Sequence, residues 1–259
     1  MIVNLKDTFN NVVTMYDAAR PTYPLELLND IKDFAEKSFF TRGLEIGAGT
    51  GQATDLFIKV INDLDIVEVG DKQVDYLMEK YKSENVNTYK AYFEDFKSNK
   101  KYDLIFSATA FHWVDATVGY PKVWDMLNDS GVLAVFWHMS SVTLHDTGIF
   151  VGLNEIKKKY LPEESLGFDK EGIEGVRQKR ISQFQSGNYF GIPVIKEYRW
   201  IDTYDADRYS LLLESYSSTQ TLDEEHKKLY LSEVRDYINS NGGVVEMPQH
   251  VMLYLVKKE

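Results

Sequence analysis

Short apolar runs alternate with segments of helical apolar spacing along the first half of the chain. The runs predict strands, and apolar residues that recur every three or four positions predict the helices between them. The predicted strands begin at residue 44 and then cover 65–69, 86–91, 103–108 and 131–137, and the predicted helices cover 25–35, 52–61, 74–81 and 121–127. This alternation is typical of an α/β fold in which a mostly parallel sheet has helices on both faces.

The pattern changes after His138. Residues 139–193 contain glycines, few long apolar runs and a charged helical stretch, and we interpret them as a cap inserted over the ligand edge of the sheet. Strands are predicted again at 194–203 and 250–256, with helices at 209–213 and 226–238 between them. The pattern therefore predicts one domain over residues 1–259, with its last two strands antiparallel to each other.

Composition narrows the classes of function. The chain has 259 residues, no cysteine, and 40 acidic against 29 basic residues, which gives a formal net charge of −11. An acidic protein repels nucleic acid on average, and the basic cluster of Arg177, Lys179 and Arg180 is typical of a solvated helix face. The sequence has no apolar run of membrane-spanning length, no secretory signal pattern and no i, i+4 pair of histidines. We therefore expect a cytoplasmic monomer or homodimer without metal, nucleic-acid partner or membrane contact.

A glycine-rich turn follows the first predicted strand. Residues 44–51 read Leu-Glu-Ile-Gly-Ala-Gly-Thr-Gly, and a helical pattern begins directly after them. Glycine permits positive φ and close approach of a ligand, and a strand, turn and helix in this order are typical of a nucleotide-like site. Gln52 stands where the dinucleotide fingerprint needs a third glycine, and residues 44–58 contain no Lys or Arg. These features disfavour a nicotinamide dehydrogenase and a polyphosphate site.

Glu68 ends the second predicted strand, 17 residues after the last glycine of the turn. A carboxylate at this place can accept hydrogen bonds from both hydroxyls of a ribose. Asp71 is the rival candidate, and it could equally cap the helix that begins there. The distance from the glycine turn favours Glu68 as the ribose ligand.

Five motifs in register carry a resemblance to a known family. They are the glycine turn, Glu-Val-Gly at 68–70, Phe-Glu-Asp-Phe at 93–96, Tyr-Asp-Leu-Ile-Phe-Ser-Ala-Thr-Ala-Phe-His-Trp-Val-Asp at 102–115, and the leading Tyr-Asp-Ala-Ala-Arg-Pro-Thr-Tyr-Pro at 16–24. Over roughly residues 12–137 the chain resembles the class I S-adenosylmethionine-dependent methyltransferases, and within them the small-molecule group related to trans-aconitate methyltransferases. The resemblance implies a Rossmann-like, seven-stranded, mostly parallel sheet with its last strand antiparallel. It also implies S-adenosylmethionine across the carboxyl ends of the first four strands.

The resemblance also implies which residues bind the cofactor. The methionine part of the cofactor would contact the glycine turn and the end of the fourth strand. Its ribose would bind Glu68, and its adenine would contact the residues that follow the second and third strands. The residues so assigned are Glu45, Gly47, Ala48, Gly49, Ala108 and Thr109 for methionine, and Val69, Tyr92, Phe93 and Glu94 for adenine. Many relatives have an aspartate in place of Tyr92, so stacking or a backbone contact would replace that hydrogen bond here.

Four residues are candidates for the substrate side. Tyr16 and Arg20 would fold over the cofactor, and Arg20 would pair with its carboxylate or with an anionic substrate, unless it forms an ordinary surface ion pair. His112 would be a base or a hydrogen-bonding partner of the substrate, unless it only begins a helix. Trp113 would form a wall of the pocket rather than a cation–π partner of the sulfonium. Trp137 and His138 would line the same cavity, and residues 216–218 would close it.

The expected activity is methyl transfer to a small-molecule acceptor, either a carboxylate or a hydroxyl, by in-line displacement. A carboxylate acceptor needs no base, whereas a hydroxyl needs one. The alternative is a regulatory module that binds S-adenosylmethionine without catalysis, because the sequence contains no clear general base.

Overall fold

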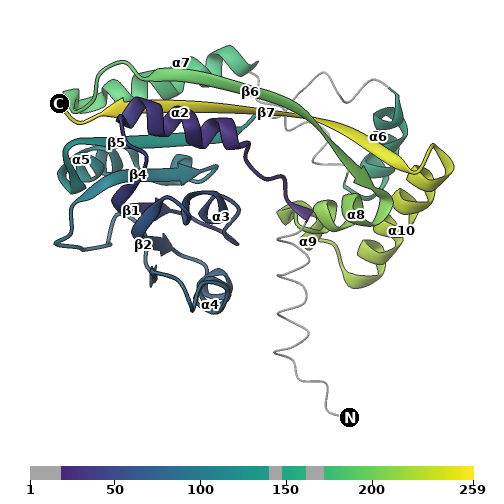
Figure 1. The fold of residues 1–259 in the computed structure, drawn as a ribbon. Coiled ribbons are helices and arrows are strands. Elements are labelled where there is room, and N and C mark those ends of the chain that lie inside the picture. Colours follow the sequence, from purple (N-terminus) through teal and green to yellow (C-terminus); the bar gives the residue numbers. More distant parts are fainter. Residues whose placement is uncertain (1–18, 140–147, 162–171) are drawn as a thin grey trace, which may run out of the picture. The chain divides into compact units, whose positions relative to one another are not determined.

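The computed structural model describes residues 19–139, 148–161 and 172–259, and it contains a seven-stranded sheet (Figure 1). The strand order is β3-β2-β1-β4-β5-β7-β6. The strands are β1 (Phe40–Ile46), β2 (Ile61–Glu68), β3 (Val86–Lys90), β4 (Tyr102–Ala108), β5 (Leu127–His138), β6 (Val194–Asp205) and β7 (Val244–Lys257). The helical segments among the described residues are α2 (Leu25–Ala35), α3 (Thr54–Phe57), α4 (Asp71–Lys80), η1 (Phe111–Trp113), α5 (Ala116–Met126), α6 (Ile149–Tyr160), α7 (Gly172–Gln185), η4 (Ser186–Asn188), α8 (Ala206–Glu214), α9 (Ser217–Gln220) and α10 (Glu224–Ser240).

Strand direction places the ends of β1 to β5 at one edge of the sheet. β1 pairs in parallel with β2 and β4, β2 with β3, and β4 with β5. β7 pairs antiparallel with β5, from Val132 opposite Lys257 to His138 opposite Val251. The predicted Rossmann-like sheet with an antiparallel last strand is therefore confirmed. Because parallel strands have their carboxyl ends together, the segments that follow β1, β2, β3 and β4 meet at the same edge.

Several predicted boundaries differ from the structure, and the starts of α5, β5 and β7 lie four to six residues earlier than predicted. The helix predicted at 52–61 is α3, which is only four residues long, and β2 begins at Ile61 rather than at residue 65. The extra strand residues include Asn62 and Asp63, which hydropathy alone assigns to a loop. They extend the strand because Phe40 pairs with Ile61 and Arg42 with Asp63 along the edge of β1.

Aromatic side chains fill both faces of the central strands. Phe57 of α3 stacks on Phe106 of β4 with 4.1 Å between ring centroids. Neighbouring positions of a strand point to opposite faces, and the face of Ile105 packs instead in the cluster that contains Tyr120 of α5 and Phe184 of α7. Tyr120 and Phe184 have ring centroids 5.0 Å apart. β4 is thus buried on both faces, which explains why Leu104, Ile105 and Phe106 are consecutive apolar residues instead of alternating with polar ones.

The contacts divide the chain into two compact units. Among the described residues, one unit contains residues 19–21, 148–161, 172 and 199–250, and the other contains residues 22–139, 173–198 and 251–259. In the first, α6, α8 and α10 pack together around residues such as Leu153, Leu212 and Val234. The second contains β1 to β5 and the glycine turn. Residues 139–193 contribute to both units, and their predicted role as a cap over the ligand edge stays a prediction, as does the single domain.

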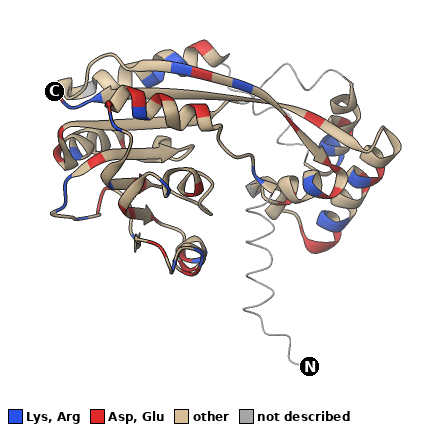
Figure 2. Cartoon of the chain, viewed as in Figure 1, with Lys and Arg blue, Asp and Glu red and all other residues tan. Residues whose placement is uncertain are grey.

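Charged residues of both signs are interspersed along the helices, as on α2 and α10 (Figure 2). The central strands β4 and β5 are mostly uncharged, in keeping with their burial. No helix in the described part of the chain is both long enough and apolar enough to cross a membrane.

Candidate functional site

The three glycines of the turn after β1 all have positive φ: 72° at Gly47, 60° at Gly49 and 95° at Gly51. A Cβ on Gly47 would lie 2.5 Å from the Cβ of Ala110, and one on Gly51 would collide with the hydroxyl of Tyr81. A Cβ on Gly49 would have no neighbour closer than the Oε1 atom of Gln52, at 3.9 Å. Gly47 and Gly51 are therefore fixed by protein packing as well as by φ, whereas the side of the turn at Gly49 is open.

Two residues at the end of α4, Lys80 and Tyr81, form hydrogen bonds with the glycine turn and the segment after it. The hydroxyl of Tyr81 has one proton to donate, and two acceptors lie within its reach, the Asp55 carboxylate at 2.7 Å and the carbonyl oxygen of Gly51 at 3.1 Å. The Lys80 ammonium donates to the carbonyl oxygen of Thr50 at 3.1 Å. Burial, with the neighbouring carboxylate of Asp55, raises the pKa of the Tyr81 phenol. Sequence reasoning missed this support, because residues thirty positions apart carry no local pattern that links them.

Glu68 is bonded directly to the glycine turn. Its Oε2 atom accepts the backbone N–H of Gly49 at 2.9 Å, and its Oε1 atom accepts those of Val69 and Gly70 at 2.8 and 3.0 Å. A carboxylate has about four lone-pair positions, so three backbone donors leave one for a ligand. The sequence predicted Glu68 as a ribose ligand but not as the residue that holds the turn.

The rival carboxylate, Asp71, has no such contact among the bonds of the described residues. Asp71 is the first residue of α4, its side chain is exposed, and it forms an ion pair with Lys90. The N-cap residue of α4 is Gly70, whose extended backbone precedes the helix, and not Asp71. The predicted alternative that Asp71 caps this helix is therefore wrong by one residue.

Glu45 is completely buried in the strand that leads into the turn. The hydroxyl of Thr54 donates to its Oε2 atom at 2.5 Å, while its Oε1 atom is buried without a hydrogen-bond partner. Burial raises the pKa of this carboxyl to about 8, and the bond from Thr54 opposes the shift. A buried carboxyl with one unsatisfied oxygen is costly to the fold, and it is suited to a cationic group brought by a ligand.

The residues predicted at the adenine separate into exposed and packed side chains. Val69 and Tyr92 follow the adjacent strands β2 and β3 and are exposed, Tyr92 by 67%. Phe93 is buried in the core, beneath the Lys122 ammonium, which lies 5.2 Å from its ring centroid. Glu94 accepts the backbone N–H of Asp115 at 3.0 Å. Of the two aromatic residues predicted at the adenine after β3, Tyr92 is exposed and Phe93 is buried.

The end of β4 has a strained residue. Thr109 has a φ of 53°, which is uncommon for a β-branched side chain. Its hydroxyl lies 3.1 Å from the Tyr23 hydroxyl and accepts the backbone N–H of His138 at 3.3 Å. Ala108, directly before it, is the last residue of β4 and is half-buried. Tyr23 belongs to the Arg-Pro-Thr-Tyr-Pro motif, but its contact with Thr109 is visible only in the structure.

His112 and Trp113 lie in η1, after β4. The Trp137 indole Nε1 atom donates to Nδ1 of His112 at 3.1 Å, and the Arg180 guanidinium lies 3.8 Å from the centroid of the Trp137 ring. Trp113 is 82% exposed, and its ring lies at 4.9 Å from that of His112. The structure therefore brings His112 and Trp137 together as predicted neighbours, and it adds Arg180, which sequence reasoning had assigned to a solvated helix face.

Arg20 belongs to the unit that contains residues 199–250, whereas the glycine turn belongs to the unit that contains residues 22–139. Its guanidinium donates to the hydroxyl and to the carbonyl oxygen of Ser215, each at 3.1 Å, and lies 5.6 Å from the centroid of the Tyr216 ring. The leading motif thus meets the late segment that was predicted to close the substrate side. Tyr16 lies outside the described residues, so its role stays a prediction.

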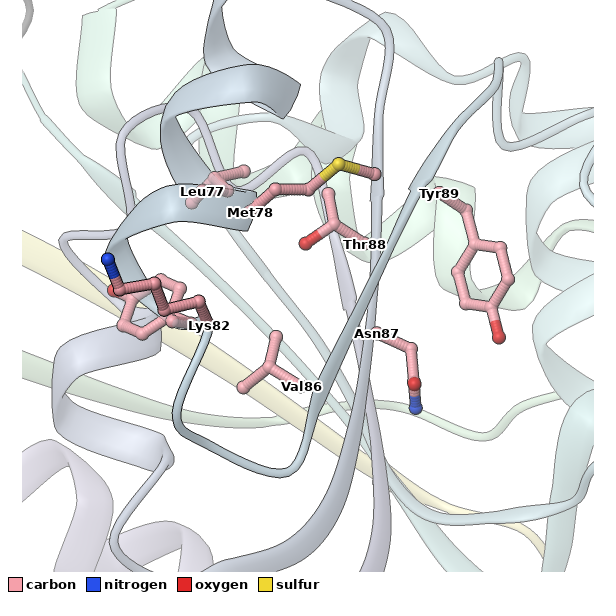
Figure 3. Close-up of a pocket in the computed structure, with 8 residues that line it drawn as sticks. Leu77, Met78, Lys82, Val86, Asn87, Thr88 and Tyr89 are labelled. Carbon is pink, nitrogen blue, oxygen red and sulfur yellow. The ribbon is translucent and has the colours of Figure 1, made fainter. Parts of the chain in front are cut away.

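A separate cavity of about 360 Å³ lies between α4 and the edge strand β3 (Figure 3). Its lining consists of Leu77, Met78, Tyr81, Lys82, Val86, Asn87, Thr88 and Tyr89. None of the residues predicted to contact cofactor or substrate is in this set. The cavity therefore does not define the candidate site, which is built on the turn after β1 and the ends of β2 to β5.

Comparison with known proteins agrees with this geometry. Residues 44–135 match a methyltransferase domain. The uncharacterized methyltransferase-like protein C25B8.10 of Schizosaccharomyces pombe is 29% identical over 146 residues, 55% of this chain and 55% of that protein. The uncharacterized methyltransferase Rv3342 of Mycobacterium tuberculosis is 28% identical over 131 residues, 51% of this chain and 52% of that protein. The chain thus spans about half the length of the curated relatives it matches.

Solved structures share the fold at low sequence identity. A protein of Anaeromyxobacter dehalogenans, provisionally named a type II methyltransferase, superposes with a TM-score of 0.58 at 18% identity and covers 92% of this chain and 96% of its own. The YcgJ protein of Bacillus subtilis superposes with a TM-score of 0.53 at 17% identity, over 90% of this chain and 99% of its own. The domain match and the relatives show that residues 44–135 of this chain are similar to methyltransferase domains, and the solved structures show that the chain shares their fold.

Proposed function

We propose that this chain transfers the methyl group of S-adenosylmethionine to a small-molecule acceptor by in-line displacement. The observation that carries the proposal is the hydrogen bond of 2.9 Å between Gly49 and Glu68, which joins the open glycine turn to an acidic strand end. When bound, the cofactor supplies an electrophilic methyl group on a sulfonium. The protein's contribution is then alignment of the two reactants and exclusion of water.

The buried polar atoms fit this cofactor. The unsatisfied Oε1 atom of Glu45 suits the ammonium group of its methionine part, and a nearby cation would lower the raised pKa of that carboxyl. The open side of Gly49, with Gly47 and Ala48, leaves backbone accessible to the same part. The remaining lone pair of Glu68 suits a ribose hydroxyl.

The remaining cofactor contacts rest on position and exposure. Val69 and Tyr92 offer apolar surface at the ends of adjacent strands, which suits the two faces of an adenine. Phe93 and Glu94 would act mainly by fixing the segment that carries Tyr92, since both are held by other protein groups.

The acceptor class is inferred from the sequence resemblance and from aromatic side chains beside η1. The resemblance to trans-aconitate methyltransferases favours a small acid, and Arg20 offers a cation for a carboxylate, whereas a hydroxyl acceptor needs a base. We infer a cytoplasmic monomer or homodimer acting on metabolites rather than on nucleic acid, in keeping with the formal charge of −11.

The second candidate is a regulatory module that binds the cofactor without turnover. The observation in its favour is that His112, which the sequence offered either as a base or as a hydrogen-bonding partner of the substrate, already uses its Nδ1 atom as an acceptor for Trp137. Such a module would conserve the cofactor pocket and respond to cofactor binding through a partner.

Two measurements on the full chain separate these candidates. Calorimetric titration with S-adenosylmethionine and S-adenosylhomocysteine should give saturable binding for both. Methyl-labelled cofactor, incubated with the protein and a metabolite extract, should give labelled small molecules, with heat-denatured protein as control. Binding without labelled product would favour the regulatory module, label confined to macromolecules would contradict the small-molecule acceptor, and no binding by folded protein would exclude both candidates.

A further inference from the structure

Trp137 and His112 form a hydrogen bond whose direction is fixed by chemistry. The indole Nε1–H of Trp137 is a donor only, and it lies 3.1 Å from Nδ1 of His112. Nδ1 must therefore present its lone pair to Trp137. In a neutral imidazole the proton is then on Nε2, and in an imidazolium a second N–H would oppose the indole N–H.

Arg180 adds a positive charge to the same group. Its guanidinium lies 3.8 Å from the centroid of the Trp137 ring, against the face of the residue that donates to His112. Burial, and then the charge of Arg180, lower the pKa of the His112 imidazole below its ordinary value. The hydrogen bond and the nearby cation therefore act in the same direction, because both disfavour protonation at Nδ1.

The two phenols that experience the charge of Arg180 add no negative charge to this cluster. Tyr120 of α5 and Tyr254 of β7 both experience the charge of Arg180, and burial raises the pKa of each phenol, so both stay neutral. Glu174 and Glu197 are the carboxylates that act on Tyr254, and Arg177 forms ion pairs with both. The pKa of His112 is shifted by burial and by Arg180.

The cluster lies beside the predicted cofactor site. The Cβ of Ala110, two residues before His112, packs so closely on Gly47 that a Cβ there would approach it to 2.5 Å. Trp137 is the second-last residue of β5, and its neighbour Phe136 pairs with Ala108 at the end of β4. The segment that carries His112 thus lies against the glycine turn through Ala110, and His112 itself bonds to β5 through Trp137.

We propose that Trp137 and Arg180 are positioning residues that hold His112 as the neutral Nε2–H tautomer, so that its ring offers the methyl acceptor a hydrogen-bond donor and not a base. The role toward the acceptor rests on the proposed methyl transfer, whereas the tautomer does not. A neutral imidazole has one lone-pair nitrogen, and Trp137 occupies it. Removal of a proton by His112 would require that this buried bond first break.

The tautomer is measured without any substrate. In the full chain labelled with ¹⁵N-histidine, two-bond ¹H–¹⁵N correlation spectra distinguish Nδ1–H from Nε2–H, and His112→Gln identifies the signal. We expect the Nε2–H tautomer for His112, and we expect its imidazole to titrate with a midpoint below about pH 6.5, the ordinary value for histidine. Trp137→Phe should populate both tautomers and raise this titration midpoint. Arg180→Gln should raise the titration midpoint while the Nε2–H tautomer is retained. Arg177→Gln, on the same helix, is the matched control and should change neither.

An Nδ1–H tautomer in the wild-type protein overturns the proposal, and this measurement decides even if Trp137→Phe fails to fold. A spectrum of Trp137→Phe identical to that of wild type also overturns it. Cofactor binding, measured on the same samples by calorimetry, reports separately on the proposed function. Loss of that function alone therefore leaves the tautomer result unaffected.

Turnover separates a donor from a base. The side chain of glutamine can place an N–H near the position of Nε2, so we expect His112→Gln to keep kcat within about tenfold of wild type, with His112→Leu falling further. A general base typically contributes about 10²- to 10⁴-fold, and both variants would lose that factor if His112 removed a proton. Equal losses of this size in both variants would refute the donor role.

Discussion

Replacement of Glu68 by glutamine tests the centre of the proposed site. The two side chains have the same shape, but the amide has one accepting oxygen and an NH₂ group that cannot accept. In the wild-type protein three backbone N–H groups, at Gly49, Val69 and Gly70, donate to the carboxylate. The amide oxygen can accept two of them at most, so at least one N–H loses its partner.

The magnitudes follow from this count. An unsatisfied buried donor costs about 1–3 kcal/mol, so Glu68→Gln should lower the free energy of unfolding by that amount. One lone pair of the carboxylate remains for a ribose hydroxyl, and a hydrogen bond to a charged group contributes about 1.5–3 kcal/mol. Its loss should weaken cofactor binding by about 10- to 100-fold.

Urea unfolding and calorimetric titration with S-adenosylhomocysteine measure the two effects. Asp71→Asn is the matched control, because Asp71 is the rival carboxylate and its exposed side chain pairs with Lys90 rather than with the turn. We expect that control to change unfolding by less than about 0.5 kcal/mol and to leave the dissociation constant unchanged. A cofactor analogue that lacks one ribose hydroxyl should bind wild type more weakly but bind Glu68→Gln with no further loss.

The reasoning would be refuted by either of two results. The first is an unchanged dissociation constant for Glu68→Gln in folded protein. The second is an equal loss of affinity in Asp71→Asn, which would assign the ribose to Asp71. A loss in Glu68→Gln that adds fully to that of the deoxy analogue would attribute the effect to the turn instead of the ribose.

Three further predictions concern the turn and its support. Gly51→Ala should destabilise the fold by more than about 1 kcal/mol, since the φ of 95° at Gly51 is unfavourable for alanine and the new Cβ would meet Tyr81. Gly49→Ala should chiefly weaken cofactor binding, because the side of the turn at Gly49 is open. Thermal unfolding and calorimetry compare the two variants, and equal losses of stability would contradict the difference in packing. Tyr81→Phe removes the hydroxyl whose one proton is shared between Asp55 and the carbonyl oxygen of Gly51, and it should cost about 1–2 kcal/mol in urea unfolding. No change in the free energy of unfolding would show that the hydroxyl does not support the turn. Because the pKa of Glu45 is raised to about 8 in the fold, the folded state binds the proton of this carboxyl more tightly than the unfolded state does. The free energy of unfolding should therefore fall between about pH 4.5 and pH 8, by at most about 1.4 kcal/mol per pH unit. Glu45→Gln should flatten this decline, and parallel plots of stability against pH for the two proteins would contradict the raised pKa.

Local sequence patterns predicted the strands well where each strand is buried on both faces. β4 lies close to its predicted position, and the buried residues 131–137 of β5 match the predicted strand, although β5 begins earlier, at Leu127. The patterns failed at α3 and at the start of β2, where polar residues such as Asp63 extend the strand through pairing with β1. Hydropathy reports burial of a side chain, but strand pairing is a backbone property that polar residues share.

The sequence by itself determined the glycine turn, the acidic residue at the end of the second strand and the family resemblance, because each is a fixed spacing within a short segment. Only the tertiary structure decided that Glu68 bonds to the backbone of Gly49, that Tyr81 supports Gly51, and that Trp137 and Arg180 both act on His112. These contacts join residues from different strands and helices. Their geometry depends on sheet register and helix packing, which are set by the whole chain and have no signal in local residue spacing.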